Sequence, residues 1–169
     1  MDILLVDGYN IIGAWPELRV LKDKDLAMAR DILISRMAEY QAYTGYQVIV
    51  VFDAHMSQGI ETKYKNHRVD VIYTRENETA DERIEKLAIS LSDIRTQVHV
   101  ATSDFTEQWA IFGQGALRKS ARELLNESNM IETKIKKRVT KFTNEKPSKR
   151  IELDNEISAI FEKWRRGQR

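Results

Sequence analysis

Three short apolar runs that lead into aspartates constrain this chain more than any other feature. They precede Asp7, Asp53 and Asp104. Continuous apolar runs of this length are typical of strands that are buried on both faces of a parallel sheet. The carboxyl ends of parallel strands lie at one edge of the sheet, and function usually sits there. We therefore expect these three side chains to converge, although nearly 100 positions separate the first from the last.

Helical patterns separate the apolar runs. Asp25 is placed to cap a helix whose apolar residues recur up to Tyr40, and Gly45 ends it. A second helix is predicted from Thr79, and Val69–Tyr73 is predicted as a further strand. The apolar face of that second helix comprises Ile84, Leu87, Ala88, Leu91 and Ile94. The alternation predicts an α/β fold with a mainly parallel sheet covered by helices on both faces.

The pattern after Gly115 is helical and charged. Helices are predicted over 104–112, Leu117–Asn126 and Leu153–Trp164. We expect residues 1–125 to form the core and residues 126–169 a basic helical extension packed on it, within a single domain.

Composition narrows the function classes. The absence of cysteine excludes disulfides, thiolate metal sites and cysteine nucleophiles. The longest apolar runs are far below the roughly 20 residues that a membrane span needs, so a cytoplasmic protein without a membrane partner is expected. The chain has 27 basic and 26 acidic residues, yet residues 131–150 carry eight basic against two acidic side chains. This basic segment, and not the net charge of the whole protein, would therefore attract a polyanion such as a nucleic acid.

Two further carboxylates are expected at the same edge. Asp81 and Glu82 lie in the first turn of the helix predicted from Thr79. Like charges at close range raise one another's pKa unless a positive group compensates, and a divalent cation is the natural one. Oxygen ligands without cysteine or a histidine cluster suit Mg²⁺ or Mn²⁺. Such an ion supports phosphodiester hydrolysis.

Each acidic residue also has a purely structural interpretation. Thr79 and Glu82 match a capping box, and Asp104 with Glu107 matches another. Asp53 is also explained as the residue that ends its strand. Asp7 is harder to explain structurally, because it is followed by Gly8, which permits a tight turn, and by Asn10, whose amide can orient water or a phosphate.

Four ordered motifs carry a resemblance to a known family. They are Leu5-Val6-Asp7-Gly8-Tyr9-Asn10-Ile11-Ile12, Val50-Val51-Phe52-Asp53-Ala54, Glu78-Thr79-Ala80-Asp81-Glu82-Arg83-Ile84 and Ala101-Thr102-Ser103-Asp104. Together they resemble the NYN-domain branch of the PIN-like nucleases, and the whole chain is similar to its bacterial YacP-like members. The resemblance implies a PIN-like three-layer α/β/α sandwich and metal-dependent endoribonuclease activity.

The resemblance also implies roles for particular residues. Asp7, Asp81 and Asp104 would hold the metal, with Asn10 and Glu82 supporting them and Asp53 nearby. Some family members have another acidic residue where this chain has Gln108. One Mg²⁺ or Mn²⁺ ion is therefore predicted, and a second is left open.

Basic residues are the candidates for binding RNA. Those selected are Arg118, Lys119, Lys134, Lys136, Lys137, Arg138 and Lys141, with Arg122 near the first two. They form either a surface that tracks phosphates, with Phe142 stacking on a base, or an ordinary solvated helix face.

The sequence is compatible with three functions. The leading hypothesis is a metal-dependent endoribonuclease that cuts single-stranded or accessible RNA, with mRNA as substrate and the ribosome as a candidate partner. A non-catalytic RNA-binding module with a degenerate nuclease site is the alternative. An aspartyl-nucleophile phosphomonoesterase ranks low, because it normally needs a second aspartate where this chain has Tyr9.

Overall fold

The computed structural model describes residues 1–54, 69–104, 115–165 and 167; for residues 144–162 and 164 it describes the backbone alone. The elements in chain order are β1 (Asp2–Asp7), α1 (Gly8–Ala14), α2 (Pro16–Lys22), α3 (Leu26–Thr44), β2 (Gln47–Phe52), β3 (Asp70–Tyr73), α4 (Ala80–Leu91), β4 (Gln97–Ala101), β5 (Leu117–Lys119) and α6 (Ala121–Arg165).

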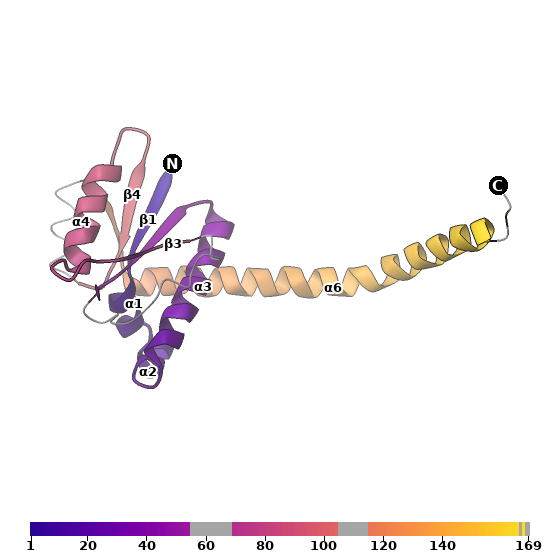
Figure 1. Ribbon diagram of the computed structural model, residues 1–169, viewed down its shortest axis with the longest axis horizontal. Helices are drawn as coiled ribbons and strands as arrows, with labels where there is room; N and C mark the ends of the chain where they lie inside the picture. Colours follow the sequence, from indigo (N-terminus) through magenta and orange to yellow (C-terminus); the bar gives the residue numbers. More distant parts are fainter. Residues whose placement is uncertain (55–68, 105–114, 166, 168–169) are drawn as a thin grey trace. The chain divides into compact units, whose positions relative to one another are not determined.

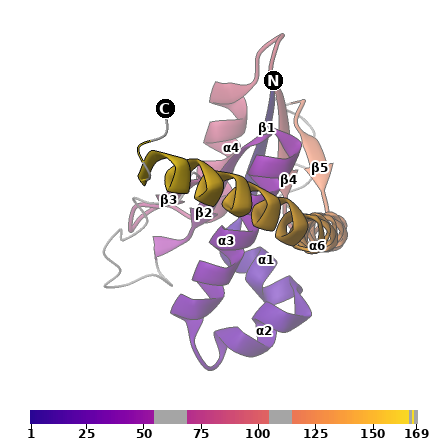
Figure 2. The same ribbon diagram turned by 90° about the vertical axis from the view of Figure 1, so that its right-hand side faces the viewer.

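The five strands form one parallel sheet in the order β3-β2-β1-β4-β5 (Figure 2). Val6 of the central strand is aligned with Val50 of β2 and Ala101 of β4. The residues that follow β1, β2 and β4 therefore leave the sheet at the same edge, which we call the carboxyl edge. The prediction that these strands end at one edge is confirmed, and the convergence of the three aspartate side chains stays a prediction.

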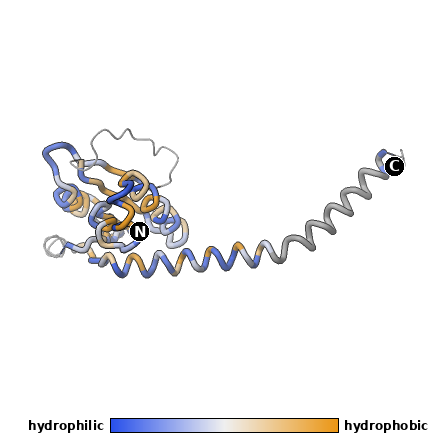
Figure 3. The backbone as a smooth tube through the Cα atoms, turned by 90° about the horizontal axis from the view of Figure 1, so that it is seen from below, coloured by the Kyte–Doolittle hydropathy of each residue, from blue (hydrophilic) through white to orange (hydrophobic). Residues whose placement is uncertain are grey.

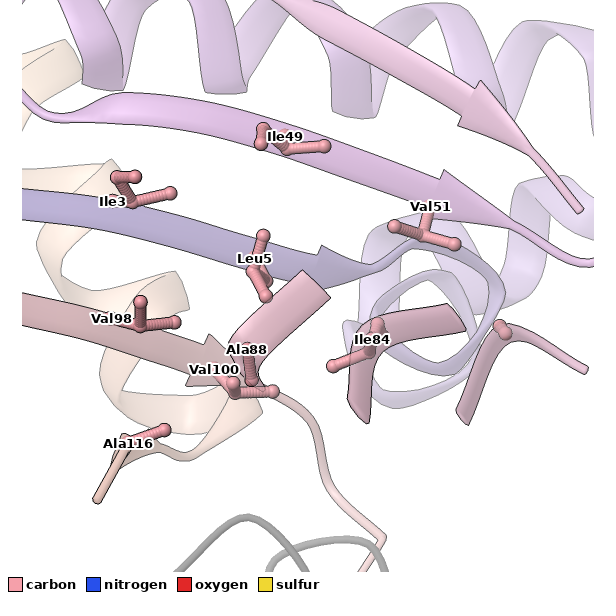
Figure 4. Packing of buried hydrophobic residues seen from close by; sticks show 10 residues of the cluster. Ile3, Leu5, Ile49, Val51, Ile84, Ala88, Val98, Val100 and Ala116 are labelled. Atoms are coloured by element: carbon pink, nitrogen blue, oxygen red, sulfur yellow. The ribbon is translucent and has the colours of Figure 1, made fainter. Parts of the chain in front are cut away.

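Helix α4 covers one face of the sheet. Its Ala80, Ile84 and Ala88 share a buried cluster with alternate residues of the three central strands (Figure 4). Those strand residues are Ile3, Leu5, Ile49, Val51, Val98 and Val100. Period-2 alternation sends the neighbouring strand residues to the opposite face.

Helices α1 and α3 lie on that opposite face, away from α4 (Figure 1). Leu4, Val6 and Val50 point to this side and are fully buried, as is Leu33 of α3. Helix, sheet and helix make three layers. The predicted α/β/α sandwich is confirmed.

Local signals define two of the helices as expected. Asp25 accepts a hydrogen bond from the Met28 backbone N–H at 3.1 Å, and Gly45 ends α3 in the left-handed region with φ of 78°. Thr79 Oγ1 accepts from the Glu82 N–H at 3.2 Å at the start of α4. The predicted caps of both helices are confirmed.

Other expectations were wrong. Leu117–Lys119 is the edge strand β5 and not the start of a helix, because it pairs with His99–Ala101 of β4 and α6 begins only at Ala121. Ile94 lies beyond α4 and is fully exposed, so it belongs to no apolar face. Helices α1 and α2 were not predicted. The helix expected over 104–112 lies outside the described residues after its first position.

The chain divides into two units, Met1–Ile131 and Glu132–Arg169. Helix α6 is one continuous helix that runs from the first unit into the second, where two separate helical segments had been expected. Hydrophobic residues gather in the strands of the first unit, whereas the start of the second is mostly hydrophilic (Figure 3). The packing of residues 126–169 on the core stays a prediction. Among the described residues, no helix combines the length and apolar composition that a membrane crossing requires.

Candidate functional site

Asp7 is the last residue of β1 and lies at the centre of the carboxyl edge. Its relative exposure is only 6%, although it is charged. It occupies the N-cap position of α1 with φ of −76° and ψ of 94°, and its side chain does not cap that helix. Capping of α1 therefore does not account for this buried carboxylate.

Gly8 allows a ring to pack directly on the backbone beside Asp7. A Cβ atom at this position would lie 2.3 Å from Cε1 of Phe52, well inside van der Waals contact. No positive φ is involved, because among the described residues only Gly45, Gly115 and Gly167 have one. The chain passes directly from β1 into α1 at this glycine, and the close approach of Phe52 is a reason for it that the sequence did not predict.

Tyr9 completes an aromatic stack beneath the carboxyl edge. Its ring centroid lies 4.9 Å from that of Phe52, which in turn stacks on Tyr73 at 5.6 Å. The Tyr9 hydroxyl accepts a hydrogen bond from Nη1 of Arg30 at 3.0 Å. Arg30 is buried on α3 and is a basic residue next to the first motif that the sequence did not reveal. Arg30 was missed because it lies 21 positions after Tyr9 in the chain. Its place among the buried residues of a predicted helix was the signal that could have revealed it.

Asn10 joins β1 to the end of β4. Its Oδ1 accepts from the Ser103 backbone N–H at 2.6 Å, from Ser103 Oγ at 2.8 Å and from Thr102 Oγ1 at 3.3 Å. We call this group of Asn10, Thr102 and Ser103 the asparagine clamp. The Asp104 N–H donates to Thr102 Oγ1 at 3.1 Å, so the clamp also sets the backbone that carries Asp104.

Asp7 ends β1, and Asp104 follows the adjacent strand β4 in a backbone segment that the clamp holds to Asn10, three residues after Asp7. Asp7 is buried, and Asp104 is half-buried. The predicted cap of Asp104 by Glu107 lies outside the described residues, as does Gln108.

The start of α4 lies toward the same edge. Ile84 packs near Val51 at the carboxyl end of β2, and Ala80 lies one turn earlier in the helix (Figure 4). Asp81 and Glu82 occupy this first turn, and both are exposed. The backbone N–H of Glu82 donates to Thr79 Oγ1, which is the contact of the predicted helix cap.

Glu78 is a buried carboxylate that the motif analysis quoted but did not assign. Its Oε1 lies 2.8 Å from Nε of Arg83, and its Oε2 lies 3.6 Å from Nζ of Lys86. With an exposure of 8%, it is compensated by two cations and orients the beginning of α4.

Asp53 directly follows β2. The turn after it is closed by Thr74, whose N–H donates to the Phe52 carbonyl at 3.0 Å and whose Oγ1 accepts from the Ala54 N–H at 3.0 Å. Asp53 is half-buried at the carboxyl edge, and its supporting role stays a prediction.

The donors of this edge are carboxylate and amide oxygens, the chemistry that Mg²⁺ and Mn²⁺ prefer. Within the described residues, no three or more His, Cys, Asp or Glu side chains are grouped closely enough to hold a metal ion. Asp7, Asp81 and Asp104 therefore do not form a preassembled cage. Mg²⁺ takes one or two carboxylates and completes its shell with water and substrate phosphates, so the donor set fits this ion. The assignment of the three ligands stays a prediction.

The predicted RNA-binding residues fall into two groups. Arg118 is exposed on β5, whereas Lys119 has a side-chain exposure of 14% and holds Glu127 through an Nζ–Oε1 contact of 2.6 Å. Glu127 Oε2 also accepts from the Tyr40 hydroxyl at 2.6 Å. Lys119 thus uses its charge inside the protein, and of this pair Arg118 reaches solvent.

The second group lies on α6 in the unit Glu132–Arg169. Lys134, Lys136, Lys137, Arg138 and Lys141 are all exposed, and so is Phe142. Lys136 lies 3.5 Å from Glu132 in an exposed i,i+4 pair, which is a weak interaction. RNA binding by these residues stays a prediction.

Comparisons with known proteins agree with this geometry. The chain matches the YacP-like NYN domain over residues 4–166. It is 68% identical over 167 residues to Uncharacterized protein YacP of Bacillus subtilis (strain 168), covering 99% of this chain and 98% of that protein.

Two crystal structures of Rae1 (YacP) from Bacillus subtilis are similar to the chain. One has a TM-score of 0.81 at 67% identity, covering 99% of this chain and 97% of that one. The other, a W164L mutant, has a TM-score of 0.77 at 68% identity and covers 86% of each chain. On its sheet, its motifs and these matches, the chain belongs to the YacP-like NYN domain family of the PIN-like nuclease superfamily.

Proposed function

We propose that this protein is a metal-dependent endoribonuclease that hydrolyses phosphodiester bonds of RNA. The observation that supports this best is that Asp7 ends β1 and Asp104 follows the adjacent strand β4, in a segment that the asparagine clamp holds to Asn10. Two carboxylates that follow neighbouring strands at one edge of a sheet suit a divalent cation. The family's nuclease character supports the reaction class.

Asp7, Asp104 and Asp81 are the residues that would hold Mg²⁺ or Mn²⁺. When bound, the ion supplies a hydroxide nucleophile near neutral pH and stabilises charge on the displaced oxygen. Asp7 is buried at the end of the central strand β1, so it is the proposed anchor. Glu82, in the first turn of α4, and Asp53, at the end of β2, would support these three ligands. Asn10 acts as a positioning residue, because its amide oxygen is occupied by the backbone that carries Asp104.

The exposed cations of α6 are proposed to bind the RNA backbone. Lys134, Lys136, Lys137, Arg138 and Lys141 would interact with phosphates without reading sequence. We further propose that the substrate is mRNA and that the protein acts in the cytoplasm. The ribosome is the proposed partner, because its RNA exposes many phosphate groups.

The direct test is cleavage of labelled single-stranded RNA by the purified protein, with Mg²⁺, with Mn²⁺ and with a chelator. Asp7→Asn and Asp81→Asn remove proposed ligands with little change in volume. Asp70→Asn is the matched control, because Asp70 is exposed, begins the outer strand β3 and is aligned with Ile49, three residues before the end of β2.

We expect metal-dependent cleavage that falls by about 10²-fold or more in both ligand variants and is kept in the control. Metal-dependent cleavage that persists undiminished in Asp7→Asn and Asp81→Asn would refute the site assignment.

One observation favours the non-catalytic RNA-binding module as a second candidate. The described carboxylates do not form a ready three-ligand group. The same experiment separates the two functions, since binding of RNA without cleavage under every metal condition supports the module.

A further inference from the structure

A cavity of about 520 Å³ lies in the unit Met1–Ile131 beside the asparagine clamp. Its walls come from the junction of α1 and α2, Ser103 two residues after β4, strand β5 and the first two turns of α6. The residues that define its chemistry are Trp15, Pro16, Ser103, Arg118, Ser120 and Arg122. Ligand pockets are about 300–1,000 Å³, so the volume suits a single small group.

The charged side chains among the described residues of this lining are two arginines. Arg118 and Arg122 are both exposed. Planar guanidinium groups bind phosphate oxygens in a bidentate geometry. Ser103 and Ser120 add hydroxyls near them. The polar part of the cavity therefore matches an anion with several oxygens.

The rest of the lining is apolar. Trp15 is 1% exposed and forms a buried wall, and the exposed ring of Pro16 lies next to it. A ligand with an anionic end and a flatter, less polar end would satisfy both halves. A nucleotide has this composition.

The cavity walls are held before any ligand arrives. The indole Nε1–H of Trp15 donates to the Ala121 carbonyl at 2.9 Å, which ties the α1–α2 junction to the start of α6. Ser120 Oγ accepts from the Glu123 N–H at 3.1 Å. One residue from Arg118, Lys119 is fixed by its ion pair with Glu127. Such preorganisation lowers the entropy cost of binding.

Ser103 connects the cavity to the carboxyl edge. It lines the cavity, it donates twice to Asn10, and the next residue is Asp104. A group bound in the cavity would therefore lie one residue from a proposed metal ligand.

We propose that this cavity, which we call the arginine pocket, binds one nucleotide of single-stranded RNA next to the bond that is cut, with its phosphate on Arg118 and Arg122. The identification of the ligand rests on the proposed function. An acidic peptide would also be attracted to two arginines, but it offers no flat apolar group for the Pro16 and Trp15 side.

The test measures RNA binding without cleavage. A fluorescent single-stranded RNA hexamer is titrated with the full chain in a chelator, so that no metal-dependent reaction takes place. Arg118→Gln and Arg122→Gln remove one charge each from the pocket. Arg95→Gln is the matched control, because Arg95 is exposed and precedes β4 at the opposite edge of the sheet.

Each pocket variant is expected to weaken binding about tenfold and to lower the salt dependence of log K by about 0.7, the value for one phosphate contact on a single strand. Arg122→Lys should recover part of the affinity, because it keeps the charge and loses the bidentate geometry. Equal effects of Arg95→Gln and the pocket variants would overturn the proposal.

A second readout locates the ligand. Hexamer binding should shift the NMR signal of the Trp15 indole N–H, which Trp15→Phe assigns among the three tryptophans of the chain. RNA binding without this shift would place the RNA elsewhere and refute the pocket. A larger shift with a poly-glutamate peptide of equal charge than with RNA would also refute it.

The two proposals fail separately. Loss of hexamer binding in the pocket variants together with a lack of cleavage under every metal condition would refute the nuclease and keep the nucleotide pocket. Cleavage that depends on Asp7, combined with unaltered binding in the pocket variants, would refute the pocket alone.

Discussion

The carboxyl edge and the unit Glu132–Arg169 contain polar residues in very different surroundings. At the edge, Asp7 is 6% exposed, Gly8 is covered by Phe52, and one amide oxygen of Asn10 accepts from both Thr102 and Ser103. On α6, the cations from Lys134 to Lys141 are exposed, and the ion pair formed by Lys136 is a surface pair.

This difference separates two ways of using charge. A single substitution at the edge disturbs several packed or hydrogen-bonded neighbours, so its effect should be large and specific to position. A substitution on the exposed helix removes one charge and little else, so effects there should be small and follow the number of charges. The following predictions test this contrast.

Gly8→Ala should have the largest effect on stability. The new Cβ would lie 2.3 Å from the Phe52 ring, and the required shift should lower the free energy of unfolding by about 1–3 kcal/mol or more, measured by urea denaturation. Gly13→Ala is the control, because its nearest neighbour is Lys22 Nζ at 3.8 Å and alanine favours the helix.

Phe52→Leu should partly rescue Gly8→Ala by opening space. If Gly8→Ala and Gly13→Ala were equally stable, the close packing of the edge would not be a constraint, and the contrast with α6 would fail.

Asn10→Ala should damage the edge without touching a proposed metal ligand. It removes the acceptor of the Ser103 N–H, so we expect a loss of about 1–3 kcal/mol in stability. Displacement of Asp104 should lower RNA cleavage about 10–100-fold. Asn10→Asp keeps an acceptor oxygen and should retain more of both.

The control for Asn10→Ala is Asn129→Ala. Asn129 lies on α6, and its side-chain oxygen accepts a hydrogen bond from Arg36 of α3. Equal cleavage rates in Asn10→Ala and Asn129→Ala would show that the clamp does not position the site.

Tyr40 tests how α3 and the beginning of α6 are held together within the first unit. Burial, and then the neighbouring Glu127, raise the pKa of Tyr40 above its ordinary value of about 10. A raised pKa means that this contribution to stability is complete below pH 10 and is lost as the pH rises further, because the unfolded chain releases the proton first.

The chain should therefore lose about 1.4 kcal/mol of unfolding free energy per pH unit above pH 10 through this group, measured in urea. Tyr40→Phe should lack that slope, and Tyr43→Phe, at a more exposed position, should keep it. A slope that is unchanged in Tyr40→Phe would contradict the prediction.

Charge removal on α6 should have the smallest effect. Replacement of Lys136, Lys137 and Arg138 by glutamine should weaken RNA binding severalfold and lower the salt slope of log K by about 2, because each single-strand contact contributes about 0.7. Stability and metal binding should not change, since these side chains are exposed.

A matched triple variant replaces the exposed Lys22, Lys24 and Arg95. If both triple variants reduced the salt slope equally, the cations of α6 would have no special role in RNA binding.

Part of the fold could be predicted from local patterns. Strands β1, β2 and β4 are apolar runs, and the caps of α3 and α4 are set by Asp25 and Thr79, since each signal acts within a few residues. Strand β5 could not be predicted, because Leu117–Lys119 is three residues long and becomes a strand only by pairing with β4. The ion pair of Lys119 could not be predicted for a similar reason, because only the tertiary structure shows that Glu127 is its partner.

The sequence by itself determined the order of β1, α3, β2, β3, α4 and β4, the aspartates that follow three of these strands and the basic stretch of α6. These depend on the type and spacing of neighbouring residues. Only the tertiary structure decided that Asn10 clamps the backbone of Asp104, that Arg30 lies against Tyr9 and that Arg118 and Arg122 share a pocket with Ser103. The physical reason is that hydrogen bonds and ring contacts act over a few ångströms, and parallel pairing brings together residues that are more than 90 positions apart in the chain.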